Sequence, residues 1–220
     1  MRIYIVRHGE SYSNTGGRMM STTDSPLTEK GIHQSEAARD YLQEIIFDHI
    51  FASPLIRAKR TAEIICGDEG KIEICDNLKE MHLGKLEGLT WEERHRRFRD
   101  IDIEGGLSRA QMPEGESFED LVSRCNTFIK EKLDAIEKDK NILIVSHGIT
   151  KRVLINELLG KPRHYADHIN WADNTAISEI DRSEKTLIRL NDRKHIVDLG
   201  IANSNYEEWG LFSSQDYTQL

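Results

Sequence analysis

Three short apolar runs limit most strongly what this chain can fold into. They occupy residues 3–6, 50–52 and 142–145, and β-branched or aromatic side chains are frequent in each. A run without polar interruption is typical of a strand that is covered on both faces, as in a parallel sheet. We therefore expect these runs to be the buried strands of a layered α/β structure.

Helical patterns fill the sequence between these runs. Thr28 predicts the N-cap of one helix, and Ser117 followed by Asp120 three residues later resembles the capping box of another. A third helix is predicted from about residue 149 to residue 159, ending before Gly160. Strands that alternate with helices imply a largely parallel sheet with right-handed crossovers.

Two later segments predict an antiparallel finish to the sheet. Residues 175–180 and 186–190 have the pattern of a hairpin around residues 182–185. The predicted architecture is α/β, with three layers (α/β/α) and a mostly parallel central sheet that ends in an antiparallel edge. In such sheets ligands bind beyond the carboxyl ends of the strands, so residues that directly follow a strand are the first functional candidates.

Length and composition favour one domain over residues 1–220 and exclude some classes of function. Lys and Arg number 30 against 38 Asp and Glu, and the net charge of -8 argues against a general binder of nucleic acid or anionic membrane. No apolar run approaches the roughly 20 residues of a membrane span, and residues 3–6 are too short for a signal peptide, so a cytoplasmic protein is expected. The widely spaced Cys66, Cys75 and Cys125 are expected to be reduced.

Two of the three apolar runs lead into the same dipeptide. Arg7-His8-Gly9 follows the first run, and Ser146-His147-Gly148 follows the last. The histidine would lie at the carboxyl edge of the sheet, while the glycine allows a tight turn and leaves room for a ligand. One such histidine is more often a hydrogen-bonded turn residue, but the repeat after two matched strands favours a functional pair. If the strands are neighbours, the two imidazoles face one another.

The run at residues 50–52 is followed by a helix start that carries Arg57. Pro54 suits a first helical turn, and Arg57 lies close to that turn near the same edge of the sheet. Most arginines at helix starts are solvated, yet Arg7, Arg57 and the two histidines together would form a positive pocket in a negative protein. Guanidinium groups bind phosphate oxygens bidentately, so a phosphoryl group is the simplest ligand that fits.

We expect no metal and no cofactor at this site. The chain has no His-x-His or His-Glu-x-x-His spacing, and the neighbouring arginines would repel a cation bound between His8 and His147.

Several separated motifs carry a resemblance to a known family. They are Arg7-His8-Gly9-Glu10-Ser11 with Asn14, Ser53-Pro54-Leu55-Ile56-Arg57-Ala58, Glu80 before Gly84-Lys85-Leu86-Glu87-Gly88, and Ser146-His147-Gly148. In this order, from residue 2 to about residue 180, they resemble the histidine phosphatase superfamily, in its phosphoglycerate mutase-like branch. The resemblance implies that His8 is the phosphorylated nucleophile and Glu80 the proton donor. It also implies that Arg7, Arg57, His147 and Asn14 bind the phosphoryl oxygens.

The chemistry of these groups supports such roles independently. A neutral imidazole is a competent nucleophile near pH 7, and two arginines with a second histidine can stabilise the charge of a transferring phosphoryl group. A carboxyl group beside a bound phosphate anion tends to keep the proton that the departing alkoxide needs. By its own surroundings Glu80 would be an ordinary surface carboxylate, Glu10 competes for the acid role, and Asn14 would equally stabilise a turn.

A charged segment follows Gly88, and the resemblance implies a cap over the pocket at about residues 85–115. Arg94 and Arg97 in this segment are candidates for binding a second acidic group of the substrate, although a mixed charge run is usually a solvated helix face. The tail at about residues 200–220 contains Trp209 and Phe212 and would pack on the domain or on a second subunit, or fray.

The sequence thus predicts a metal-independent phosphomonoesterase that hydrolyses a small phosphorylated metabolite through a phosphohistidine. The alternatives are a phosphoglycerate mutase-type isomerase and a non-catalytic sensor of a phosphorylated ligand on the same fold. The tail, at about residues 200–220, carries no Lys or Arg from residue 201 on to help hold a bisphosphorylated intermediate, which favours hydrolysis. The expected partner is that metabolite, with neither nucleic acid nor membrane, and a homodimer is left open.

Overall fold

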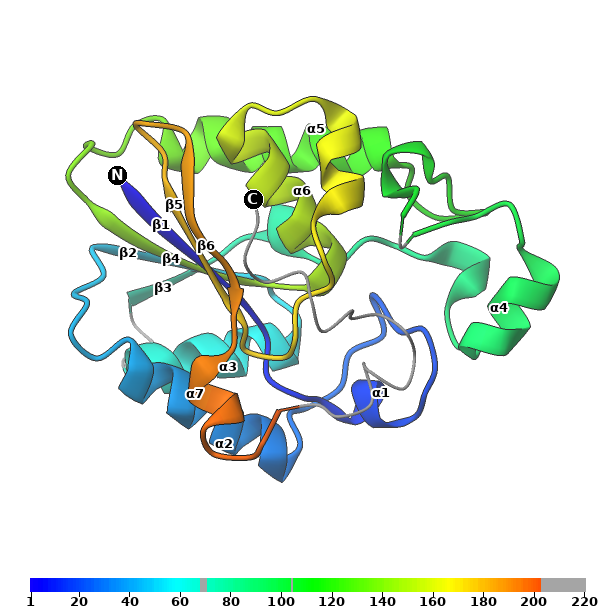
Figure 1. Cartoon of the computed structure of the whole chain (residues 1–220), viewed down its shortest axis with the longest axis horizontal. Coiled ribbons are helices and arrows are strands. Elements are labelled where there is room, and N and C mark those ends of the chain that lie inside the picture. Colours follow the sequence, from blue (N-terminus) through cyan, green and yellow to red (C-terminus); the bar gives the residue numbers. More distant parts are fainter. Residues whose placement is uncertain (68–70, 104, 203–220) are drawn as a thin grey trace.

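A computed structural model describes residues 1–67, 71–103 and 105–202, and one six-stranded sheet runs through it (Figure 1). The strand order is β3-β2-β4-β1-β5-β6. In chain order the strands are β1 Arg2–Arg7, β2 His49–Ala52, β3 Ile72–Ile74, β4 Asn141–Ser146, β5 Ile177–Asp181 and β6 Thr186–Asp192. The first four pair in parallel, whereas β5 and β6 are antiparallel. The predicted parallel sheet with an antiparallel edge is confirmed.

The two strands that precede a His-Gly dipeptide are direct neighbours. β1 pairs with β4 in parallel, with Val6 opposite Val145 and Arg7 opposite Ser146. Both strands are buried on both faces, which explains why their sequences are continuously apolar. The pairing brings the ends of both strands to one edge of the sheet.

Helices cover both faces of the sheet and make the predicted three layers (Figure 1). Ile3 and Ile5 pack on the face covered by α5 (Phe118–Phe128) and α6 (Gly148–Leu159). Tyr4 and Val6 pack on the opposite face, which is covered by α2 (Glu29–Tyr41) and α3 (Ile56–Cys66). Alternate side chains of β1 thus enter two separate apolar clusters, as the pleat of a strand requires.

The predicted helix ends have the expected chemistry. Thr28 caps α2 by accepting a hydrogen bond from the backbone of Gly31, and Ser117 and Asp120 form the capping box of α5. Helix α6 ends at Gly160, whose φ of 63° lies in the left-handed region that suits glycine. A π-helical turn, Ile129–Leu133, prolongs α5, and a short helix α7 (Lys194–Val197) packs beside α2.

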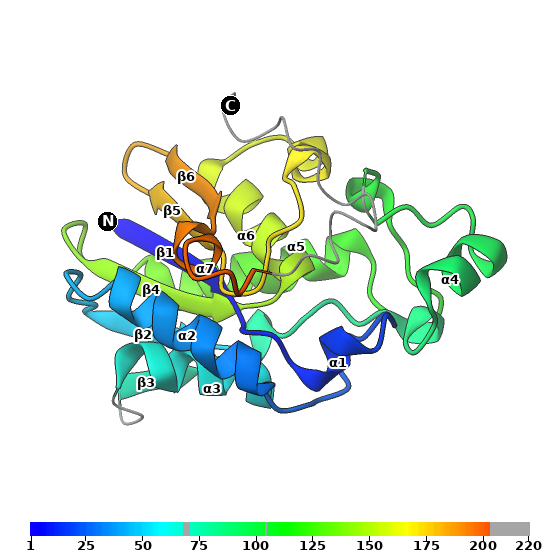
Figure 2. The same cartoon turned by 60° about the horizontal axis from the view of Figure 1, so that its bottom comes forward.

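The carboxyl ends of β1 and β4 point toward the part of the molecule that holds α1 (Tyr12–Thr15) and α4 (Trp91–Arg97) (Figures 1 and 2). Helix α4 belongs to the segment for which a cap was predicted, and it lies away from the sheet in both views. The single domain and its cap over residues 85–115 stay predictions. Residues 203–220 of the predicted tail, with Trp209 and Phe212, lie outside the described residues.

Within the described residues no helix is both long enough and apolar enough to cross a bilayer. All three cysteines are free, and two of them, Cys75 and Cys125, are buried.

Candidate active site

The adjacent strands β1 and β4 bring the two predicted histidines together. His8 follows β1 and its backbone nitrogen donates to the carbonyl oxygen of Ser146 at 2.9 Å, while His147 follows β4. The two imidazole rings lie with their centroids 5.1 Å apart, and both side chains are buried.

The hydrogen bonds of His8 determine which ring nitrogen can react. Nδ1 lies 2.7 Å from the carbonyl oxygen of Gly9, an acceptor, so Nδ1 carries the proton and Nε2 keeps a lone pair. The Nε of Arg57 donates to that lone pair at 3.2 Å. Burial lowers the pKa of His8 well below its usual value, and the positive charges of Arg57 and Arg7 lower it further. His8 is therefore a neutral imidazole with its basic nitrogen directed at Arg57.

His147 has the complementary arrangement. Its Nε2 lies 2.8 Å from the hydroxyl of Ser53, and its buried Nδ1 has no hydrogen-bond partner within the described part of the chain. Burial, followed by the charge of Arg57, lowers the pKa of His147 well below the ordinary value. If the Ser53 hydroxyl donates to Nε2, the proton of the neutral ring lies on Nδ1 and is available to an anion.

Arg57 and Arg7 are both buried and are held by backbone carbonyl groups. Arg57 lies in the first turn of α3, and its terminal nitrogens donate to Ser21 O at 2.5 Å and to Thr23 O at 3.2 Å. Arg7 donates from Nη1 to Ala172 O at 2.6 Å. With His8 and His147 they concentrate positive charge and hydrogen-bond donors in one place, as a tetrahedral oxyanion requires.

Glu87 holds the loop that in turn holds Arg57. Its carboxylate accepts hydrogen bonds from the backbone nitrogens of Ser21 (3.2 Å) and Thr23 (2.8 Å) and from the hydroxyls of Ser21 (3.0 Å) and Thr22 (3.3 Å). Partial burial opposes ionisation of Glu87, but these hydrogen bonds outweigh it and lower the net pKa of the carboxyl. The carbonyls of the same short loop receive the Arg57 guanidinium.

Glu80 lies in the pocket and also caps a helix. Its Oε1 accepts from the backbone nitrogens of Met81 (2.9 Å) and Thr150 (3.0 Å) and from the Thr150 hydroxyl (3.1 Å), while Oε2 accepts from Ile149 N at 3.1 Å. Ile149 and Thr150 belong to the first turn of α6, directly after His147. A carboxylate is well placed there, because the first amides of a helix lack partners in the helix. The same helix start therefore fixes Glu80 and His147 relative to each other.

A segment before β5 supports the backbone of the nucleophile. The side-chain nitrogen of Asn174 donates to His8 O at 2.8 Å, and the backbone nitrogen of Thr175 donates to Arg7 O at 3.0 Å. Thr175 is fully buried and has a φ of 57°, a left-handed conformation that is strained for a β-branched residue. This strained residue therefore contacts the backbone of the candidate nucleophile, through its N–H to the carbonyl oxygens of Arg7 and His8.

Close backbone packing on the other side requires glycine. A Cβ atom at Gly9 would lie 2.5 Å from Gly31 O and 2.8 Å from Ser35 Oγ, so the turn after His8 fits against α2 only without a side chain.

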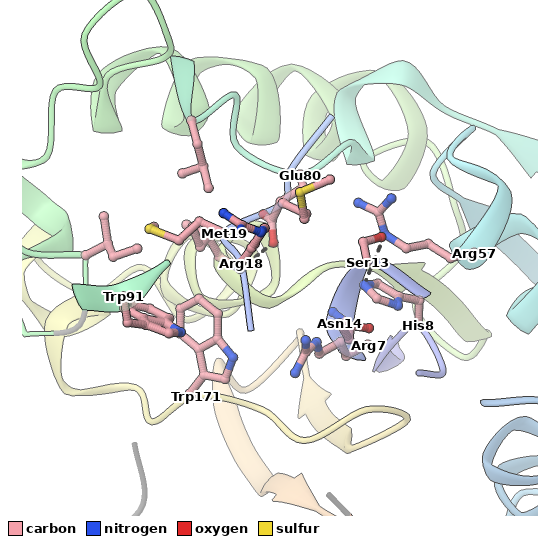
Figure 3. Close-up of a pocket in the computed structure, with 14 residues that line it drawn as sticks. Arg7, His8, Ser13, Asn14, Arg18, Met19, Arg57, Glu80, Trp91 and Trp171 are labelled. Atoms are coloured by element: carbon pink, nitrogen blue, oxygen red, sulfur yellow. Dashed lines mark hydrogen bonds between the residues drawn. The ribbon is translucent and has the colours of Figure 1, made fainter. Parts of the chain in front are cut away.

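One pocket gathers most of the predicted site residues (Figure 3). Arg7, His8, Asn14, Arg57 and Glu80 all line it, and the ring of His147 lies beside that of His8. In Figure 3, His8, Arg57, Arg7 and Asn14 lie at one end and Trp91 and Trp171 at the other. Within the described residues no cluster of three or more His, Cys, Asp or Glu side chains could hold a metal ion.

Asn14 has a turn-stabilising role as well as a place in the pocket. Its Oδ1 accepts from Ser11 N at 3.0 Å in the capping box of α1, and Asn174 Nδ2 lies 3.4 Å from the same oxygen. Glu10 is paired with Lys30 at 3.4 Å and accepts from the Thr28 hydroxyl. Glu10 therefore contacts two residues at the start of α2, the N-cap residue Thr28 and Lys30.

Arg94 and Arg97 are not among the residues that line the pocket, and their contact with the substrate stays a prediction. Arg94 is buried within α4, with Nη1 2.8 Å from His95 Nε2 and its guanidinium over the Trp91 ring. Arg97 is exposed, and its guanidinium lies over the ring of Phe98.

Several residues of the site were not predicted as functional. No pattern in the sequence indicated a functional role for Trp171, Met19 or Asn174. Glu87 belongs to a motif of the family resemblance, but no role was assigned to it.

Comparison with known proteins identifies relatives along most of the chain. The family model of the histidine phosphatase superfamily (branch 1) matches residues 3–193. A protein of Photorhabdus laumondii named "Probable phosphoglycerate mutase GpmB" is 35% identical over 195 residues, covering 82% of this chain and 85% of the relative.

Solved structures with the same fold include two phosphatases. The alpha-ribazole phosphatase of Shigella flexneri superimposes with a TM-score of 0.76 at 31% identity, covering 88% of this chain and 97% of that one. A mycobacterial glucosyl-3-phosphoglycerate phosphatase superimposes with a TM-score of 0.74 at 26% identity, covering 81% of this chain and 92% of that one.

Proposed function

The chain belongs to the histidine phosphatase superfamily, and on this premise we propose that it is a metal-independent phosphomonoesterase of a small phosphorylated metabolite. The observation that carries the proposal is the state of His8. Its imidazole is neutral, and its unprotonated nitrogen is Nε2, which accepts a hydrogen bond from Arg57 in a pocket that also contains Glu80.

In the proposed first step, His8 Nε2 attacks the phosphorus atom of the ester. The nitrogen–phosphorus bond forms while the bond from phosphorus to the ester oxygen breaks. Arg7, Arg57 and the Nδ1 of His147 donate hydrogen bonds to the phosphoryl oxygens and stabilise their charge. When the anion binds, the hydrogen bond from Arg57 Nε must pass from His8 Nε2 to a phosphoryl oxygen. The lone pair of His8 Nε2 is therefore released for attack only in the presence of the substrate.

Glu80 is proposed to donate the proton that the leaving alkoxide needs. The bound phosphoryl group brings negative charge next to the carboxyl and so favours its protonated form. The products of this step are the free alcohol, phospho-His8 and ionised Glu80.

In the second step, water replaces the alcohol and attacks the phosphohistidine. Glu80 accepts a proton from that water, the nitrogen–phosphorus bond breaks, and inorganic phosphate leaves with His8 neutral again. One carboxyl group therefore serves as acid and then as base. A neutral imidazole nucleophile and two arginines supply this chemistry without a metal ion.

The second candidate function is phosphoryl isomerisation, which the names of the sequence relatives favour. An isomerase must return the phosphoryl group of phospho-His8 to a second hydroxyl before water reaches it. With 3-phosphoglycerate as substrate, release of inorganic phosphate supports hydrolysis, whereas formation of 2-phosphoglycerate supports the isomerase.

The test of the mechanism is turnover and trapping with the whole chain. We expect hydrolysis of p-nitrophenyl phosphate in the presence of EDTA, an acid-labile phosphohistidine at residue 8 by mass spectrometry, and no detectable turnover by His8→Ala. Substantial hydrolysis by the folded His8→Ala protein would overturn the phosphohistidine mechanism. Binding of phosphate esters by calorimetry without turnover over hours would favour the sensor hypothesis.

A further inference from the structure

The pocket continues beyond the phosphoryl site into an apolar wall. Six residues form this wall, which we call the leaving-group subsite: Met19, Met20, Leu83, Trp91, Ile103 and Trp171. They come from the loop after α1, from the segment that carries α4 and from the approach to β5. Met19, Leu83 and Ile103 are buried, so the wall is continuous with the core and is preformed.

Few of the described residues that line the pocket offer a positive charge to a second acid group. Apart from His8, the described residues of the pocket lining that have ionisable side chains are Arg7, Arg57, Glu80 and Arg18. The first three belong to the proposed phosphoryl and proton chemistry. Arg18 donates to Gly88 O at 2.8 Å and lies 3.6 Å from the carboxylate of Glu93. A carboxylate or second phosphate on the leaving group would therefore have to compete with Glu93 for Arg18, and would otherwise be desolvated against apolar side chains.

Trp171 presents a hydrogen-bond donor to the space between the two ends of the pocket. Its indole Nε1 is fully buried and has no hydrogen-bond partner within the described residues. Figure 3 shows this nitrogen on the side of the ring that faces Arg7, and a guanidinium can only donate. An oxygen atom of the substrate would satisfy this N–H, which otherwise is buried unpaired at a cost in free energy.

We propose that the substrate is a phosphate monoester whose leaving group is uncharged and carries an aromatic ring or a comparable apolar body. The ring packs against Trp91 in the leaving-group subsite, and the Trp171 N–H donates to an oxygen of the leaving group. In the proposed mechanism the phosphoryl oxygens accept hydrogen bonds from Arg7, Arg57 and His147, so the indole N–H is assigned to the other part of the ester. This inference rests on the proposed hydrolase function and narrows its substrate class.

The test compares esters whose alcohols leave with similar difficulty. We expect kcat/KM for 3-phenylpropyl phosphate to exceed that for glycerol 1-phosphate and for 3-phosphoglycerate by about 10-fold to 100-fold, the range that burial of one ring supports. A higher kcat/KM for either of the two polar esters would overturn the inference.

Substitutions then locate the effect. Trp91→Ala should lower kcat/KM for 3-phenylpropyl phosphate about 10-fold more than it lowers kcat/KM for glycerol 1-phosphate, and Trp91→Phe should restore most of that difference. Trp171→Phe, which keeps a ring but removes the N–H, should lower kcat/KM for the phenylpropyl ester about 5-fold to 10-fold and weaken inhibition by inorganic phosphate by less than that. Glu92→Ala, an exposed change on the same helix as Trp91, is the matched control. Equal losses for both esters in Trp91→Ala would contradict the subsite.

A failure of the proposed function gives a different result. If the wild-type chain releases phosphate from none of these esters, the hydrolase proposal fails. The subsite is then tested by binding alone. Calorimetry with a non-hydrolysable phenylalkyl phosphonate should still show tighter binding than with methylphosphonate, and Trp91→Ala should remove that difference.

Discussion

Glu87 is predicted to control the phosphoryl site through Arg57, although the structure shows no contact between its carboxylate and the nucleophile. The carboxylate fixes the loop at residues 21–23 by four hydrogen bonds, and the carbonyls of Ser21 and Thr23 fix the Arg57 guanidinium. Removal of Glu87 should release this loop and allow the guanidinium to leave its position beside His8.

The size of the effect follows from the number and kind of bonds. Hydrogen bonds to a charged group contribute about 1.5–3 kcal/mol each, but bonds to one half-buried carboxylate are not additive, so we expect Glu87→Ala to lower the free energy of unfolding by about 3 kcal/mol. Glu87→Gln keeps one acceptor oxygen for the two backbone nitrogens and should lose only about 1 kcal/mol.

The kinetic effect should be smaller than that of removing Arg57 itself. Loss of one donor to a reacting oxyanion lowers the rate by about 10²–10³-fold. Glu87→Ala misplaces Arg57 without removing it, so we expect kcat/KM for p-nitrophenyl phosphate to fall about 10-fold to 30-fold, with weaker inhibition by orthovanadate.

A double-mutant cycle separates this indirect role from general damage. If Glu87 acts through Arg57, adding Glu87→Ala to Arg57→Ala should lower kcat/KM no further, whereas losses that multiply would refute the reasoning. Glu114→Ala is the control, because Glu114 is an exposed carboxylate that forms a surface ion pair with Lys85. Folded Glu87→Ala protein with wild-type kinetics would also contradict the prediction.

Three further changes test the site and its surroundings, among them one at His195 in α7, whose Nε2 lies 3.1 Å from the Thr175 hydroxyl. Glu80→Gln should lower kcat for an alkyl phosphate about 10²-fold or more but lower it less for p-nitrophenyl phosphate, whose leaving group needs no proton; equal losses would contradict its role as the acid. Burial lowers the pKa of His195 to about 4, so the unfolded state binds more protons between pH 4 and 6.5 and the free energy of unfolding falls as the pH falls through that window. His195→Gln should remove about 3 kcal/mol of that fall in denaturant titrations, and an unchanged pH slope would refute this. Gly9→Ala should lower the free energy of unfolding by about 1–3 kcal/mol, because its Cβ would lie 2.5 Å from Gly31 O; wild-type urea unfolding would show that α2 can move aside.

The fold could be predicted wherever the signal is local. Continuous apolar runs mark β1 and β4 because these strands are buried on both faces, and Thr28 and Ser117 mark helix starts because their hydroxyls cap the helix that follows them. β3 could not be found in this way, since Ile72–Ile74 is a short edge strand with half-buried and exposed side chains.

The residues of the candidate site also differ in whether a local sequence pattern predicts them. His8 and His147 follow matched strands, so parallel pairing alone brings them together. Glu80 depended on the family resemblance, because its partners in α6 are about 70 residues away along the chain. The charge of Arg94 did not predict where its guanidinium lies, because its contacts with Trp91 and His95 determine that position.

The left-handed backbone at Thr175 has a consequence for engineering the enzyme. A glycine at this position would relieve about 1–3 kcal/mol of torsional strain, but it would also loosen the segment that supports the carbonyls of Arg7 and His8. Directed evolution for heat resistance would therefore favour a substitution that directed evolution for turnover would reject. Thr175 is thus a buried position at which relief of strain and support of the nucleophile place opposite demands on the side chain.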